Sequence, residues 1–248
     1  MQIFAHRGAS ARWPENTMAA FRAALEAGVD GIETDLRLTR DGRIVLFHDP
    51  TLARMTGDPR RVDELTFGEL RRLRVAGAHP IPSLEELREE VAGRVVLNLE
   101  VKSPGVFPVL ARALGTQADE VLVTAARWRL LPAFRAARPG VRTGPVLTRM
   151  GSRQAHALSH LRFDAVSLQV DGYGRTARRW RRENRCPVLL WVVNDPARAE
   201  VLSSLGVDGI FTDDPAAFRR APEGAMGSDE RSSSSRPGAG EQPPFPHR

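Results

Sequence analysis

Several features that would place the chain in a familiar class are missing from its sequence. Among 248 residues there is one cysteine, Cys186, so no disulfide can form within the chain. Its position before Pro187 and an apolar run predicts a buried structural thiol. No stretch reaches the roughly 18 apolar residues of a membrane span. The first residues, MQIFAHRG, lack the basic and apolar regions of a signal peptide, so we expect a cytoplasmic location without a transmembrane segment.

Lysine is nearly absent as well. Lys102 is the single lysine among 36 basic residues, which face 30 acidic ones and give a formal charge of +6. A basic balance suits nucleic acid, an anionic membrane surface or an anionic substrate. Here the arginines are spread along the whole chain and mixed with acids, so we interpret the excess as a compositional bias and predict no nucleic-acid partner. The densest cluster, residues 178–182, is expected on the solvated face of a helix.

No G-x-G-x-x-G follows an apolar run, which counts against a dinucleotide-binding fold. Instead, short apolar runs alternate with helical patterns, and this alternation indicates βαβ units and a parallel sheet. Eight unbroken units, in a chain close to the roughly 250 residues of one barrel, favour a (β/α)8 TIM barrel over an open sheet or two small domains. The predicted strands are 3–5, 31–38, 95–101, 121–124, 142–147, 165–169, 188–193 and 209–212. The predicted helices include 17–27, 84–91, 130–137, 175–183 and 196–205.

Two segments depart from this regular pattern. Residues 221–248 contain 14 Pro, Gly or Ser among 28 residues and cannot bury enough apolar surface to offset their ordering entropy. We therefore predict a barrel domain over 1–220 and a disordered tail over 221–248. Residues 49–82 are longer than an ordinary βα loop, and we expect a short helix near 65–73 and a lid or wall beside the site.

Carboxylates fall on one face of two predicted strands. Glu33 and Asp35 alternate with apolar residues, and Glu100 shares a face with Lys102. Inward polar residues late in a barrel strand reach the carboxyl-end rim, where barrel active sites lie. Three converging carboxylates predict a site for a hard cation, Mg²⁺ or Ca²⁺. The alternative is a structural network in which Arg37 and Lys102 neutralise these carboxylates.

Two histidines follow predicted strands near these carboxylates. His6 ends the first strand, and His48 follows the run 44–47. Because imidazole titrates near neutral pH, two histidines flanking a phosphorus atom can act as acid and base. Arg7 offers a planar fork for phosphate oxygens, and Gly8 allows close backbone approach. With one divalent cation, Arg7 and Lys102, the site would carry a small positive charge, which suits a singly charged phosphodiester better than a dianionic monoester.

Taken in order, these residues resemble the glycerophosphodiester phosphodiesterase family, and the similarity spans residues 3–215. Two stretches depart from the family's usual sequence: Thr124-Ala125-Ala126 stands where the family often has Ser-Phe, and Val192 stands where it often has Thr. The resemblance implies that both lie in the half of the pocket that chooses the leaving alcohol. The motifs that carry the resemblance are His6-Arg7-Gly8, Pro14-Glu15-Asn16-Thr17, Glu33-x-Asp35, Thr39-Arg40-Asp41-Gly42, His48-Asp49, Ile81-Pro82-Ser83-Leu84-Glu85, Glu100-x-Lys102, Trp191-Val192-Val193-Asn194, Gly206-Val207-Asp208-Gly209 and Thr212-Asp213.

The resemblance implies a (β/α)8 barrel that hydrolyses a glycerophosphodiester to sn-glycerol 3-phosphate and an alcohol. It implies Glu33, Asp35 and Glu100 as metal ligands. It implies His6 and His48 as the acid/base pair, and Arg7 and Lys102 at the phosphate. Trp191 is expected as an apolar wall for the substrate or as plain core, Glu15 as a loop support, and Asn16 or Thr17 as a helix cap.

Three other functions remain open from the sequence. A lysophospholipase D would use the same residues on longer lipids, with a wide apolar groove near residues 49–82. A silent binding protein would sense glycerophosphodiesters, although binding needs no acid/base pair. A nucleic-acid-binding protein would show salt-dependent DNA binding without hydrolysis. The sequence leaves undecided which histidine is the acid, which nucleophile attacks first, and the oligomeric state.

Overall fold

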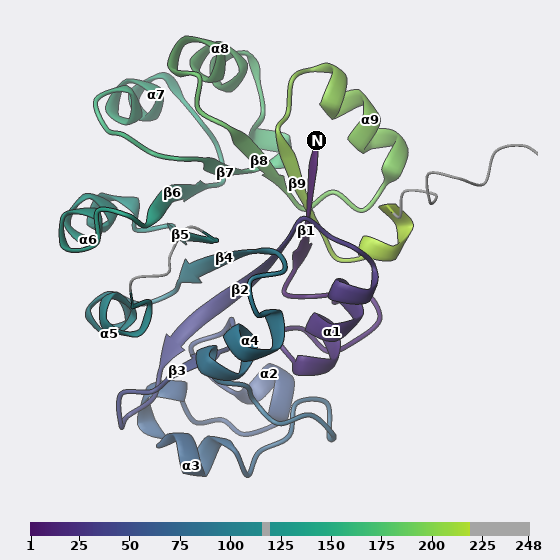
Figure 1. Cartoon of the computed structure of the whole chain (residues 1–248), viewed down its shortest axis with the longest axis vertical. Helices are drawn as coiled ribbons and strands as arrows, with labels where there is room; N and C mark the ends of the chain where they lie inside the picture. The colour runs from purple at the N-terminus through teal and green to yellow at the C-terminus, as the bar shows by residue number, and fades with distance from the viewer. Residues whose placement is uncertain (116–119, 219–248) are drawn as a thin grey trace, which may run out of the picture.

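The computed structural model describes residues 1–115 and 120–218, so the predicted tail 221–248 lies outside the described residues. Eight parallel strands pair in a closed circle, because the first strand, β1 (Gln2–His6), contacts both the second and the last. The predicted (β/α)8 barrel is therefore confirmed (Figure 1). The other parallel strands are β2 (Gly31–Leu38), β4 (Val96–Val101), β5 (Val121–Ala125), β6 (Arg142–Leu147), β7 (Val166–Gln169), β8 (Val188–Trp191) and β9 (Gly209–Thr212).

All eight predicted strands occur, with ends that differ by at most two residues. Helices lie outside them, as Figure 1 shows, and α5 and α7 complete the alternation beyond the helices predicted. Among the described residues, none of these helices is long and apolar enough to cross a membrane. The helices of the outer ring are α1 (Met18–Glu26), α4 (Leu84–Val91), α5 (Val106–Ala113), α6 (Leu131–Ala137), α7 (Ser152–Ser159), α8 (Arg175–Asn184) and α9 (Pro196–Ser204).

Helix ends follow local chemistry. Thr17 precedes α1, and its hydroxyl accepts a hydrogen bond from the amide of Ala20 at 3.3 Å. Of the two residues expected as a cap, Asn16 and Thr17, the cap is therefore Thr17. Ser83 caps α4 in a reciprocal arrangement with Glu86, which satisfies two amides that the helix itself leaves free. Both caps fix where a βα loop ends, and therefore how far each loop reaches over the barrel mouth.

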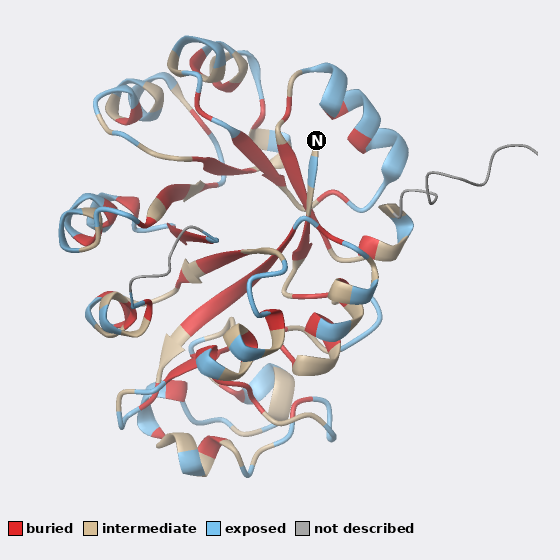
Figure 2. Cartoon of the chain, viewed as in Figure 1, coloured by how far each residue is buried: buried red, intermediate tan, exposed pale blue. Residues whose placement is uncertain are grey.

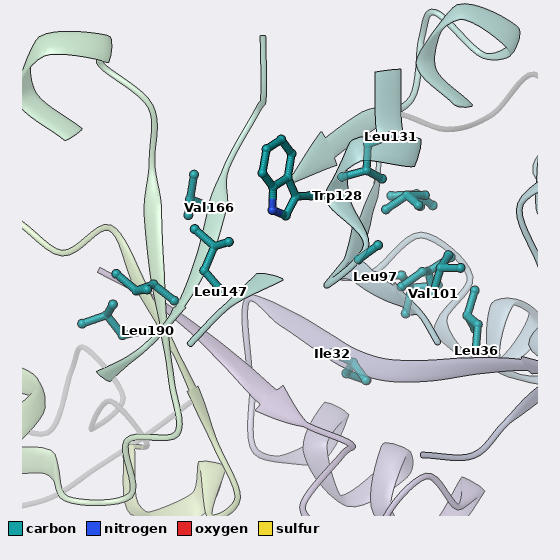
Figure 3. Close-up of a cluster of buried hydrophobic side chains, with 14 of the residues drawn as sticks. Ile32, Leu36, Leu97, Val101, Trp128, Leu131, Leu147, Val166 and Leu190 are labelled. Atoms are coloured by element: carbon teal, nitrogen blue, oxygen red, sulfur yellow. The ribbon is translucent and has the colours of Figure 1, made fainter. Parts of the chain in front are cut away.

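Alternation along the strands produces two cores. Outward residues pack under the helices in the large cluster of Figure 3, where Ile32 and Leu36 of β2 lie near Leu97 and Val101 of β4. Inward residues fill the barrel floor, where Phe4 contacts Phe211 with ring centroids 5.3 Å apart. Above this floor the inward positions change from apolar to charged, so the packed barrel supports a polar site at the carboxyl ends of its strands.

The segment after β2 is a small unit of its own. It contains β3 (Ile44–Leu46), which pairs antiparallel with β2, and its own apolar cluster around Val45, Leu70 and Ile81. The expected helix near 65–73 is α3 (Phe67–Leu70), and α2 (Ala53–Thr56) and a short 3-10 turn (Val62–Glu64) accompany it. This unit lies together at one edge of the barrel in Figure 1, and Figure 2 shows buried residues within it. None of its large apolar side chains is among the exposed ones. His48, which lines the cavity described below, directly precedes residues 49–82, but none of those residues line that cavity, so a lid or wall over the site stays a prediction.

Candidate active site

A cavity of about 270 Å³ opens at the carboxyl ends of the barrel strands. Seven of the eight predicted site residues line it: His6, Arg7, Glu33, His48, Glu100, Lys102 and Trp191. The eighth, Asp35, is fully buried beside them. A larger hollow of about 710 Å³ lies near Arg88 and Glu120 at the other end of the strands, and none of the predicted residues line it. We therefore place the candidate site in the smaller cavity.

Three carboxylates meet at one side of this cavity. Glu33, Asp35 and Glu100 each offer an oxygen within 4.8 Å of the others. Lys102 bridges two of them, with its Nζ 3.0 Å from Asp35 Oδ1 and 2.8 Å from Glu100 Oε1. The predicted cluster therefore forms, and Lys102 lies within it. Arg37, the other cation of the structural alternative, does not lie within the cluster. It donates two hydrogen bonds to the backbone oxygen of His48, at 2.9 and 2.6 Å.

The electrostatics of this cluster favour a cation. Burial, and then the nearby Asp35 charge, raise the pKa of Glu33 to about 8. Burial would also raise the pKa of Asp35, but Lys102 and Arg7 outweigh it and hold that pKa low. Asp35 Oδ1 is buried and accepts no well-aligned hydrogen bond. Arg7 and Lys102 offset only part of the negative charge of the three carboxylates, and a hard divalent cation such as Mg²⁺ or Ca²⁺ would offset the rest, so the residues fit one.

His6 is oriented by a carboxylate that we did not predict. Its Nδ1 lies 2.8 Å from Asp213 Oδ1, which also accepts from Ser10 Oγ at 3.0 Å. The other oxygen of Asp213 accepts from Asn194 Nδ2 at 2.9 Å. Burial works to lower the pKa of His6, but the bond to Asp213 and the charge of Glu33 raise it overall. Nε2 remains on the side of Glu33, 4.0 Å from its Oε2.

His48 is oriented in the same way. Its Nδ1 lies 2.6 Å from Asp49 Oδ1, and Arg54 Nε donates to the other oxygen of Asp49 at 2.6 Å. The bond from Arg54, opposed by partial burial and helped by His48, lowers the pKa of Asp49 to about 2. Asp49 is therefore ionised at neutral pH and holds the Nδ1 side of His48, so Nε2 is the nitrogen left for chemistry.

Arg54 also reaches the first βα loop. Its two Nη groups donate to the carboxylate of Glu15 at 3.0 and 2.7 Å. Glu15 in turn accepts from Arg7 Nη1 at 3.0 Å. One guanidinium thus ties the carboxylate that orients His48 to the carboxylate that holds Arg7, and Glu15 has the loop-supporting position expected for it.

Arg7 is held in a strained turn. Its φ is 57°, its amide donates to Glu33 Oε2 at 3.0 Å, and its Nε lies 3.1 Å from Asp35 Oδ2. Asn16, expected as a cap, instead donates to Asp35 Oδ2 at 2.9 Å. Gly8 has φ 84°, and a Cβ there would lie 2.7 Å from Ala20. Position 8 therefore requires a glycine, because any side chain there would clash with α1.

The opposite side of the cavity is mostly apolar. Trp191 ends β8 and faces the cavity together with Val146, Leu147 and Val192, which fits the expected apolar wall. Two polar atoms interrupt this wall, since Ser167 Oγ and Trp191 Nε1 are buried without a hydrogen-bond partner among the described residues. The apolar surface lies on the β6–β8 side, whereas the groove expected for a lysophospholipase D was near residues 49–82.

Several site residues have weak signals in the sequence. Asp213 and Asn194 lie in motifs of the family resemblance, but nothing local couples them to His6. Asp49 directly follows His48 in the sequence, and this adjacency is the one local signal that it could orient the histidine. Arg54 carries no motif at all and is identified by its hydrogen bonds alone.

Several known proteins are similar to this chain over most of its length. A glycerophosphodiester phosphodiesterase of Caldanaerobacter subterraneus subsp. tengcongensis is 31% identical over 238 residues, covering 86% of this chain and 94% of that protein. One of Bacillus altitudinis is 32% identical over 232 residues, covering 86% and 95%. The solved structure of an Oleispira antarctica phosphodiesterase in complex with the product sn-glycerol-3-phosphate has a TM-score of 0.80 and 25% identity, covering 88% of this chain and 95% of that one. A model of the glycerophosphoryl diester phosphodiesterase family matches residues 6–217, and the chain therefore belongs to that family of phosphodiester-cleaving enzymes.

Proposed function

We propose that the protein hydrolyses glycerophosphodiesters to sn-glycerol 3-phosphate and an alcohol, with a divalent cation and with His6 and His48 as the acid/base pair. One observation carries the proposal. Two histidines line one cavity, each with Nδ1 held by its own carboxylate, beside a cluster of three more carboxylates. A site that merely bound a phosphodiester would need neither orientation device.

The cation belongs on Glu33, Asp35 and Glu100. When bound, it would supply Lewis-acid polarisation of a phosphoryl oxygen and of a nearby hydroxyl. Arg7 and Lys102 both line the cavity and place two fixed positive charges beside it, where they stabilise charge that develops on the phosphoryl oxygens. Mg²⁺ and Ca²⁺ both suit this oxygen donor set.

The two histidines move the protons. In a neutral imidazole whose Nδ1–H donates to Asp213 or Asp49, Nε2 carries the lone pair and accepts a proton. In the imidazolium form, the same Nε2 donates one. One histidine therefore takes the proton of the attacking hydroxyl as the new bond to phosphorus forms. The other gives a proton to the oxygen of the leaving alcohol as its bond to phosphorus breaks.

The size of the cavity bears on the substrate. At about 270 Å³ it is slightly below the usual range for small-molecule sites, roughly 300–1,000 Å³, and suits a compact glycerophosphodiester. A lysophospholipid is the second candidate, because the apolar wall of Val146, Leu147 and Val192 offers a surface for the start of a longer leaving group. An acyl chain on such a substrate would extend out of the cavity.

A hydrolysis panel tests the proposal. Glycerophosphocholine, glycerophosphoethanolamine and a lysophospholipid are each incubated with the protein after EDTA treatment, with and without added Mg²⁺ or Ca²⁺. We expect turnover that requires a cation and is lost in His6→Ala and in His48→Ala. His156→Ala, at an exposed histidine of α7, is the matched control and should keep full turnover. Full turnover in both site variants would overturn the proposed pair, and full turnover in EDTA would overturn the proposed cation.

Whether the first nucleophile is water or the glycerol 2-hydroxyl is tested separately. The second route passes through a cyclic phosphate. Trapping that species, or finding solvent ¹⁸O in the product without it, separates the two routes.

A further inference from the structure

The arginines of the protein are distributed unevenly once their partners are considered. Residues 121–187 contain 14 arginines and three acidic residues, whereas the chain as a whole has 36 basic and 30 acidic residues. Three of these arginines, Arg135, Arg179 and Arg181, form ion pairs. The other 11 form none with any carboxylate in residues 1–115 and 120–218. Elsewhere most described arginines are paired, so the excess is concentrated on one side of the barrel, around α6, α7 and α8 (Figure 1).

Five of these unpaired arginines surround the active-site end of that side. Arg127 and Arg129 lie in the loop after β5, and Arg149 in the loop after β6. Arg153 and Arg175 lie in the first turns of α7 and α8. All five are exposed, and all follow the carboxyl ends of strands whose other residues line the cavity. We call this set, Arg127, Arg129, Arg149, Arg153 and Arg175, the arginine rim.

Exposed apolar side chains lie at the same end of the barrel. Leu130 is 38% exposed and follows Arg129 directly in the loop after β5. Trp13 is 44% exposed in the loop after β1, on the other side of the mouth. Cationic arginines beside an exposed leucine, with an exposed tryptophan across the mouth, are typical of surfaces that rest on an anionic lipid interface. Sequence-tolerant nucleic-acid grooves instead line up several exposed aromatic side chains for base stacking.

We infer that the arginine rim docks the mouth of the active site on an anionic phospholipid surface. Positive charge attracts the anionic head groups, and Leu130 and Trp13 enter the interface beside the cavity. The apolar cavity wall at Val146, Leu147 and Val192 lies on the rim side, so docking would bring that wall next to the lipids. The inference goes beyond the proposed hydrolysis, and it concerns binding that requires no turnover.

Vesicle sedimentation with two matched variants tests the inference. R127Q/R149Q/R175Q removes three rim charges. R162Q/R182Q/R185Q removes three charges that are also exposed and unpaired among the described residues, but lie at or toward the other end of the strands. The vesicles contain equal parts of phosphatidylcholine and phosphatidylglycerol, or phosphatidylcholine alone. Thermal unfolding of both triple variants checks that each is folded.

We expect the wild-type protein to bind the anionic vesicles at about 0.1 M salt, where the Debye length is about 10 Å, and not to bind the neutral ones. The rim variant should lose on the order of 100-fold in affinity, because each arginine near the surface contributes about 1 kcal/mol. The other triple variant should lose less than roughly 10-fold, since its charges lie further than a Debye length from a docked surface.

Three results would overturn the inference. The first is a wild-type protein that does not bind anionic vesicles. The second is an equal loss in the two triple variants, which would show diffuse charge attraction instead of docking at the mouth. The third is tighter, rim-dependent binding to a DNA duplex than to the vesicles, which would assign the rim to nucleic acid. Sedimentation measures binding and not turnover, so these results can be interpreted even if the proposed hydrolysis proves wrong.

Discussion

Replacing Arg54 is the sharpest perturbation that the site offers. This guanidinium donates to Asp49 at 2.6 Å and to both oxygens of Glu15 at 3.0 and 2.7 Å. Arg54→Met keeps much of the side-chain length and removes every one of these bonds. Asp49 then orients His48 without support, and Glu15 holds Arg7 without support, so both the proton transfer and the phosphate contact are disturbed by one change.

The magnitude follows from the number and exposure of these bonds. A hydrogen bond to a charged group contributes about 1.5–3 kcal/mol when it is well shielded. The Arg54 side chain is 47% exposed, so screening reduces the three bonds to a combined contribution of about 1–2 kcal/mol to stability. Loss of an orienting partner at a catalytic group costs roughly 10- to 100-fold in activity. We expect kcat/KM to fall by that factor, and Arg54→Lys to fall in between, because an ammonium cannot reproduce the planar fork.

Arg61 provides the control. It lies in the same segment, is 48% exposed, and bonds Asp63 through two nitrogens at 2.8 and 2.9 Å, away from the cavity. Hydrolysis of glycerophosphocholine and thermal unfolding are measured for Arg54→Met and Arg61→Met side by side. We expect small losses of stability in both and a loss of activity in the first alone. Equal activity in the two variants would refute the positioning role of Arg54.

Three further outcomes are expected. Asp213→Asn should lower kcat roughly 10- to 100-fold, because Asp213 orients His6; an unchanged kcat in the folded variant would contradict this role. Gly31→Ala should lower the free energy of unfolding by about 1–3 kcal/mol in a urea titration, since its Cβ would lie 2.3 Å from the Phe4 ring; an unchanged midpoint would show that the barrel floor can yield. Burial raises the pKa of the Cys186 thiol to about 12, so its reaction with a disulfide reagent should stay slow from pH 7 to 9 in folded protein and accelerate only on unfolding.

The fold could be predicted from local patterns because barrel strands and helices repeat with simple periods. The alternation of Glu33 and Asp35 with apolar neighbours placed both carboxylates on the inner face, and the register Asp35 to Glu100 between β2 and β4 brings the third beside them. Similarly, His6 pairs in register with Glu33. In a closed parallel barrel all carboxyl ends meet, so motifs far apart in sequence had to converge.

The partners of these residues depend on tertiary structure. Asn16 had the composition of a helix cap, and its side chain bonds Asp35 instead, because a turn with φ 56° aims it into the barrel. Lys102 was expected at the phosphate or, in the structural alternative, beside the carboxylates; its ammonium lies between two of them at the edge of the cavity.

The sequence by itself therefore determined the barrel, the carboxylate cluster and the two histidines, since strand periodicity and strand ends are local properties. Tertiary structure alone decided which carboxylate orients each histidine, how Arg54 joins the two halves of the site, and on which side arginines without carboxylate partners gather. Those features depend on contacts such as Asp213 with His6, between residues 207 positions apart, which no local pattern encodes.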